Sequence, residues 1–163
     1  MTLNSKSFGL SGPSDYYDKL EWEFERLMKA GNATGRELAF HAINLAITGW
    51  HMTDWTFNFL PVATKASHSN NSATFQAWVK SQSRVIAACR EVATAGKHMQ
   101  ITRGPDPAIS TFSEGYVEEG YWEDAYCESE WKILIDGQSF SLDNFGREVI
   151  NFWQCFLNSE GLL

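Results

Sequence analysis

Two groups of polar side chains in this chain of 163 residues combine residue types and spacings that suit chemistry. The first is His51 and Asp54, which stand three residues apart in the stretch TGWHMTDW, each beside a tryptophan. On a helix this spacing puts both side chains on one face. A carboxylate beside an imidazole can hold its tautomer or raise its pKa, as in general acid–base catalysis. The alternative, which we predict, is a structural pair whose members hydrogen-bond each other between Trp50 and Trp55.

The second group lies in CREVATAGKH, residues 89–98. Seven residues turn a helix by about 700°, so Arg90 and Lys97 lie on nearly the same face, with Thr94 between them and His98 at its edge. Two fixed cations and a titratable imidazole can bind a phosphate or another oxyanion. Alternatively, Lys97 and His98 only complement the dipole at the end of a helix. We predict that this edge is open to solvent in a cleft and attracts anions.

Metal and cofactor chemistry have no comparable pattern in the sequence. The four histidines form neither HxxH nor HExxH, and neither a serine nucleophile elbow nor a phosphate-binding glycine loop occurs. Three cysteines without CxxC spacing are typical of reduced thiols in a cytoplasmic protein. We therefore expect no metal and no cofactor.

The charges are unevenly distributed along the chain. The net charge is −7, yet residues 1–98 hold ten basic and eight acidic residues, whereas residues 99–163 hold three and twelve. This excludes a wholly basic nucleic-acid-binding surface. The segment 114–130 has seven acids and no Lys or Arg. It indicates either a solvated loop or hairpin, or a surface that covers a cationic site or docks a basic partner.

Helical periodicity dominates the elements that must position these groups. Apolar spacing predicts helices over residues 14–30, 34–60 and 72–98 and a last helix that begins at 141–143 and ends near 159, with a Ser/Asn-rich linker at 62–71. Strand patterns at 108–112 and 131–135 precede the tight-turn pair Asp136-Gly137. The prediction is a mainly α, four-helix domain over 1–163. It has two long helices, a β-hairpin insertion at 107–140, a flexible arm at 1–12 and, for want of a run of 18 apolar residues, no membrane span.

Packing of the two long helices limits which groups can meet. If they are antiparallel, residues 90–98 lie beside 34–44, so His41 is the natural neighbour of His98 and His51 is not. The apolar side of residues 87–98 is made of small residues, which permit close approach of another helix. Gly96 costs a helix roughly 1 kcal/mol relative to alanine, which indicates a packing or functional reason. Together with seven tryptophans, this seam predicts a homodimer.

The stretches AFHAINLAITGWHMTDW and CREVATAGKHMQITR resemble a group of bacterial and phage proteins that have a WHxxDW helix and a later CRDxANxxKH helix. The resemblance covers about residues 34–103. The helical bundle of that group is similar to HEPN domains, which are dimeric modules of toxin–antitoxin and abortive-infection systems, many of them metal-independent endoribonucleases. The resemblance implies that Arg90 holds the scissile phosphate, that His98 is the general acid/base and that Lys97 stabilises charge.

Two functions are therefore expected. One is a HEPN-like protein of a bacterial or phage stress or defence system that cleaves RNA without a metal. The other is a non-catalytic, dimeric protein-interaction module whose tryptophan-rich faces bind a partner. The edge formed by Arg90, Lys97 and His98 favours the first, and the negative net charge favours the second.

Overall fold

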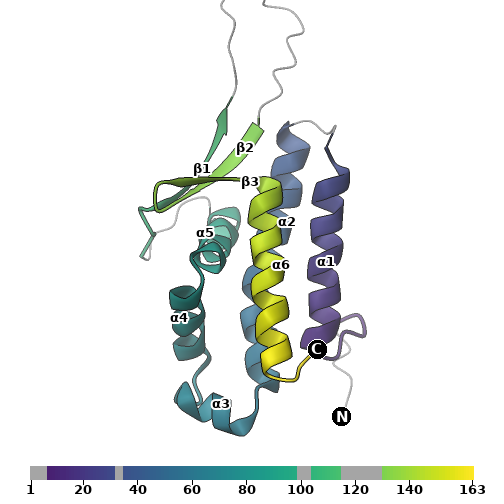
Figure 1. Ribbon diagram of the computed structural model, residues 1–163, viewed down its shortest axis with the longest axis vertical. Helices are drawn as coiled ribbons and strands as arrows, with labels where there is room; N and C mark the ends of the chain where they lie inside the picture. Colours follow the sequence, from purple (N-terminus) through teal and green to yellow (C-terminus); the bar gives the residue numbers. More distant parts are fainter. Residues whose placement is uncertain (1–6, 32–34, 99–103, 115–129) are drawn as a thin grey trace, which may run out of the picture.

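The computed structural model describes residues 7–31, 35–98, 104–114 and 130–163 (Figure 1). The predicted acidic segment 114–130 lies, apart from its two end residues, outside the described residues, and so do residues 1–6 of the predicted arm. The described elements, in chain order, are α1 (Pro13–Lys29), α2 (Gly35–Phe59), α3 (Val62–Ser67), α4 (Ser72–Gln82), α5 (Arg84–His98), β1 (Ile109–Glu114), β2 (Glu130–Ile135), β3 (Gln138–Ser141) and α6 (Leu142–Ser159).

The predicted fold class is confirmed, because the chain is mainly α with a small antiparallel sheet before the last helix. Two elements of the structure differ from those expected from the sequence. The expected linker at 62–71 contains α3, and the expected long helix at 72–98 is divided into α4 and α5. Within the described ranges no helix is long and apolar enough to cross a membrane.

Ser83 causes the division between α4 and α5. Its backbone is extended (φ −142°, ψ 114°), and its amide closes α4 by donating to the carbonyl of Val79. Its hydroxyl oxygen accepts a hydrogen bond from the amide of Ile86 at 3.2 Å, and its carbonyl accepts from the amide of Ala87. Serine is a preferred N-cap residue because its side chain can take a free amide of the first turn. The apolar periodicity continues across the break and therefore conceals it.

Helix α2 is at the centre of the bundle, between α1 and α5, and α6 crosses it (Figure 1). Two glycines mark the close approaches. A Cβ on Gly49 would lie 2.9 Å from Val149 Cγ1, and a Cβ on Gly146 would lie 2.5 Å from Phe24 Cδ2. By contrast, a Cβ on Gly96 would meet only Ile43 Cγ2, at an ordinary 3.6 Å. Within the described chain Gly96 therefore does not mark a close helix approach, and a functional reason for this glycine stays a prediction.

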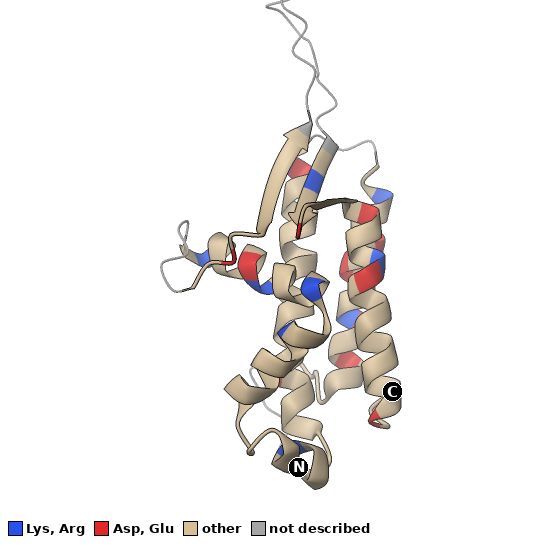
Figure 2. Cartoon of the chain, turned by 60° about the vertical axis from the view of Figure 1, so that its left-hand side comes forward, with Lys and Arg blue, Asp and Glu red and all other residues tan. Residues whose placement is uncertain are grey.

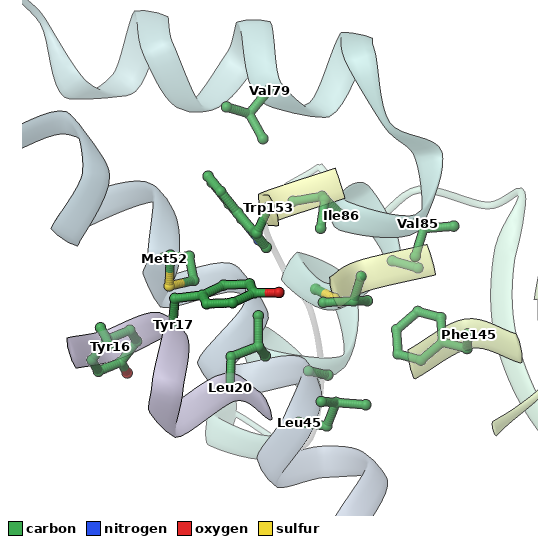
Figure 3. Packing of buried hydrophobic residues seen from close by; sticks show 14 of the residues in the cluster. Tyr16, Tyr17, Leu20, Leu45, Met52, Val79, Val85, Ile86, Phe145 and Trp153 are labelled. Atoms are coloured by element: carbon green, nitrogen blue, oxygen red, sulfur yellow. The ribbon is translucent and has the colours of Figure 1, made fainter. Parts of the chain in front are cut away.

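The core joins side chains from all the long helices. Leu20, Met52 and Trp153 pack in its centre, from α1, α2 and α6 respectively (Figure 3). The indole N–H of Trp153 donates to the carbonyl of Gly49 at 2.9 Å. Most of the described tryptophans pack within this core or against it, and Trp22 is the one that is more than half exposed. Most of the tryptophan surplus therefore serves internal packing.

The sheet has the order β1-β2-β3 and covers one end of the bundle (Figure 1). Ile109 pairs with Ile135, and Ile133 with Phe140, so these side chains share the face that packs on the helices. The predicted turn at Asp136-Gly137 is confirmed, and both residues have positive φ (51° and 81°). Hairpin turns of this kind match the twist of the strands that they join.

Arg84 attaches the sheet to the start of α5. Its Nε donates to Asp136 Oδ2 and its Nη1 donates to Asp106 Oδ2, each at 2.7 Å. These hydrogen bonds hold the pKa of both carboxyl groups below the usual value. Basic and acidic residues are interspersed along the helices (Figure 2).

Candidate functional site

The antiparallel packing of α2 and α5 places the predicted site residues. Gly49 lies against Cys89, and Gly96 lies against Ile43. The second half of α5 therefore lies beside the first half of α2, as expected. His98 is level with residues near 41, and ten residues of helix, about 15 Å, separate that level from His51. His51 and His98 thus belong to different regions of the chain.

Arg90 is bonded to the residue that follows it. Its Nη1 donates to Glu91 Oε1 at 2.5 Å, and 21% of the Arg90 side chain and 11% of the Glu91 side chain are exposed. The other carboxylate oxygen of Glu91 accepts the amide of Asp106 at 3.3 Å. Arg90 also reaches the carbonyl of Gly104 at 3.4 Å. At Arg90 the edge is therefore not open to an anion, because Glu91 neutralises the charge of its guanidinium.

The other members of the predicted edge are more accessible. Lys97 and His98 are exposed in the last turn of α5, where positive charge complements the helix dipole. Thr94 donates its hydroxyl to the carbonyl of Arg90 at 2.7 Å, a bond within its own helix. The structure therefore separates a paired, largely buried Arg90 from the exposed Lys97 and His98, which are about two helical turns away. A catalytic role for the three residues stays a prediction.

His51 and Asp54 are both exposed on α2, and the prediction of a buried, mutually bonded pair is wrong. Asp54 Oδ1 instead accepts a hydrogen bond from Gln76 Nε2 of α4 at 2.9 Å. The reason is helical phase. Residues next to each other in sequence are 100° apart around the helix axis, so Trp50 and Trp55 point in other directions and leave His51 and Asp54 exposed. Trp55 lies on the flank of this exposed stripe, where it stacks on Tyr16 at 4.8 Å.

A cleft of about 440 Å³ lies between α2, α5 and the face of the sheet that packs on the helices. Four small residues leave this space open, two on each helix: Ala39 and Ala42 on α2, and Ala95 and Gly96 on α5. The larger apolar side chains of its wall are Ile43, Val92, Ile109, Trp131, Ile133 and Leu142. Its polar or charged side chains include Glu91, Asp106, Thr111 and Lys132.

The cleft is the feature that sequence patterns did not reveal. The small residues of the later helix, Ala95 and Gly96 among them, predict a contact seam, and Ala39 and Ala42 carry no signal of their own. A seam and a cleft need the same residue types, and only the distance to the facing element separates them. Glu91 also had no distinguishing signal, since an acid beside an arginine in a helix is commonly solvated.

Covalent and metal chemistry gain little support from the described residues. Cys89 is fully buried, and this burial raises the pKa of its thiol and so disfavours the reactive thiolate. Cys155 is exposed. No group of three or more His, Cys, Asp or Glu residues in the described ranges could hold a metal ion.

Comparison of the chain with protein-family models, with curated proteins and with solved structures finds no match. Inference about function therefore starts from the chain's own residues.

Proposed function

We propose that this chain is a non-catalytic protein-interaction module that acts as a homodimer. The observation that carries the proposal is a pair of exposed aromatic residues, each covered by an arginine of its own helix. Trp22 is 52% exposed with Arg26 Cζ 4.7 Å from its ring, and Phe40 is 52% exposed with Arg36 Cζ 5.6 Å from its ring.

Both pairs lie toward the same end of the α1–α2 hairpin, because α1 ends and α2 begins there. Aromatic residues and arginine are the types enriched in protein–protein interfaces, and tryptophan and arginine dominate their binding energy. Phe40 also shares the exposed stripe of α2 with His51 and Asp54, which are 11 and 14 residues further on and return to nearly the same angle. In this proposal the two polar residues lie at the rim of the interface.

Light scattering at micromolar concentration tests the proposal. The unmodified chain should have the mass of a dimer, and the double variant Trp22→Ala/Phe40→Ala should dissociate at a concentration about tenfold higher or more. Met28→Ala is the matched control, since Met28 is also exposed on α1 (40%) but belongs to neither aromatic–arginine pair. A monomeric mass for the unmodified chain, or equal weakening by the control, would reject the proposal.

The second candidate function is a HEPN-like, metal-independent RNA-cleaving module of a bacterial or phage defence system, acting in the cytoplasm. Exposure of Lys97 and His98 at the end of α5 favours it, and the pairing of Arg90 with Glu91 opposes it. Arg90 would have to exchange Glu91 for a phosphate. Cleavage of single-stranded RNA in the presence of EDTA, lost in His98→Ala, would support this candidate. If the unmodified chain does not cleave RNA, the interaction module stands as the proposed function.

A further inference from the structure

The cleft between α2, α5 and the sheet has the dimensions of a ligand site. Its volume of about 440 Å³ falls within the range of small-molecule pockets in proteins. The space does not arise from a packing requirement of the helices. A Cβ added to Gly96 would find one neighbour, Ile43 Cγ2 at 3.6 Å, so the cleft has free space beside this glycine.

The walls favour an apolar ligand body. Val92 and Ile133 face the cleft from α5 and β2, Leu142 closes it from α6, and Trp131 contributes an indole ring. The apolar walls of an open cleft of this size are in contact with water, and a ligand of matching shape would remove that apolar surface from water.

The charges of the lining favour an uncharged ligand. The carboxylate of Glu91 already accepts from Arg90, and that of Asp106 accepts from Arg84 at 2.7 Å and from the amide of Ala108 at 3.0 Å. Lys132 has an interaction partner as well. A charged ligand would have to break one of these pairs or lose its hydration without a counter-charge, and burial of an unpaired charge is costly.

The lining keeps hydrogen-bond donors without partners in the described chain: Trp131 has a buried indole Nε1–H of this kind, and Thr111 lies at the rim of the cleft. Thr111 pairs with Ile133 across β1 and β2, so its side chain is on the face of the sheet that lines the cleft. The amide of Asp136 donates to the carbonyl of Ala108, so position 108 of the chain is hydrogen-bonded to the residue that follows β2. In an antiparallel pair every second residue is bonded to the partner strand, and Thr111 is one of the residues in between. The amide and carbonyl of Thr111 therefore point away from β2, at the free edge of the sheet. Within the described chain, neither these groups nor the Thr111 hydroxyl has a hydrogen-bond partner.

We propose that this cleft binds an uncharged, mainly apolar small molecule that carries a carbonyl or ether oxygen. The apolar body lies between α2, α5 and the sheet, and the oxygen accepts a hydrogen bond from Thr111. This inference does not depend on the proposed interaction function, which uses Trp22 and Phe40, because neither residue lines the cleft.

Prodan, an uncharged naphthalene ketone whose emission shifts to shorter wavelength in apolar surroundings, is a suitable probe. The folded chain should bind it saturably at one site. Ala95→Leu and Ala42→Leu, which extend side chains into the cleft from opposite helices, should each weaken binding about tenfold or more. The matched control is Ala77→Leu, the same change at an exposed position of α4 outside the cleft, and it should leave binding within about twofold.

Two further comparisons test the ligand class. Thr111→Val should weaken prodan about threefold to tenfold, the loss of one hydrogen bond, and should not weaken the parent dimethylaminonaphthalene, which has no carbonyl. The anionic probe anilinonaphthalene sulfonate should bind more weakly than prodan. Circular dichroism identifies any variant that does not fold. If one of the two leucine variants does not fold, prodan binding by the other one tests the proposal. Absence of saturable prodan binding, unchanged binding in the folded leucine variants, tighter binding of the sulfonate or an unchanged affinity in Thr111→Val would overturn the proposal.

Discussion

The guanidinium of Arg90 is bonded to the carboxylate of its neighbour Glu91 at 2.5 Å, and the same carboxylate accepts the amide of Asp106. One acidic side chain thus neutralises the cation of the predicted anion-binding edge and fixes the chain before β1. The charge of Arg90 is available to a ligand only if Glu91 releases it.

Glu91→Gln should change two properties at once. It should lower the free energy of unfolding by about 1–3 kcal/mol, because a largely buried charge-assisted bond is lost. It should also raise the affinity for short RNA at low salt, because Arg90 is no longer neutralised, and this binding should fall as salt increases. Urea denaturation and fluorescence anisotropy measure the two effects. The double variant Glu91→Gln/Arg90→Ala should lose the gain in affinity. If the gain persists without Arg90, another cation binds the RNA.

Stability at acid pH should depend on Arg84. Its hydrogen bonds hold the pKa of Asp106 and Asp136 below the usual 3.8. A pKa that is lower in the folded state stabilises the fold above the unfolded-state pKa, and this contribution is lost as the pH falls through the folded value. Between about pH 5 and pH 2 the melting temperature should therefore fall more steeply in the unmodified chain than in Arg84→Met.

Asp143 provides an internal reference for that experiment. A hydrogen bond from the hydroxyl of Ser141 lowers the pKa of Asp143, so it titrates in the same window in both proteins and cancels from the difference. Parallel melting curves against pH would show that the Arg84 bonds contribute no pH-dependent stability.

Alanine substitutions at three helical glycines should differ in sign. Gly146→Ala places a Cβ 2.5 Å from Phe24 and should lower the free energy of unfolding by about 1–3 kcal/mol, as overpacking does. Gly49→Ala should act in the same direction, since Val149 would be 2.9 Å away. Gly96→Ala has room and should raise it by about 0.5–1 kcal/mol through helix propensity. Thermal or urea unfolding measures all three. Destabilisation by Gly96→Ala would mean that a second element lies against it.

Asp54→Asn should change the free energy of unfolding by less than about 0.5 kcal/mol, because Asp54 is exposed and asparagine can still accept from Gln76. Thermal unfolding measures it. A loss larger than about 1 kcal/mol would support a structural pair of Asp54 with His51, as the sequence analysis predicts.

Local patterns in the sequence were enough to predict the secondary structure where each element satisfies its own rules. Helices α1, α2 and α6 begin and end within one or two residues of the expected positions, because periodicity, helix-starting residues and Pro61 act over a single turn. The turn at Asp136-Gly137 followed from two residues that tolerate positive φ. The antiparallel neighbourhood of residues 90–98 and 34–44 followed from helix length and direction alone.

Only the tertiary structure decided which partner each side chain meets. The periodicity that places Arg90 and Lys97 on one face is the same whether Glu91 is solvated or buried, and Glu91 is buried because the chain at Asp106 returns to it from 15 residues away. Small residues at 39, 42, 95 and 96 are compatible with either a close helix contact or a cleft. A cleft forms because side chains of β1 and β2 make up its remaining wall. A helical pattern specifies angles around an axis, whereas burial, charge neutralisation and cavity volume depend on the segments that approach that axis from elsewhere in the chain.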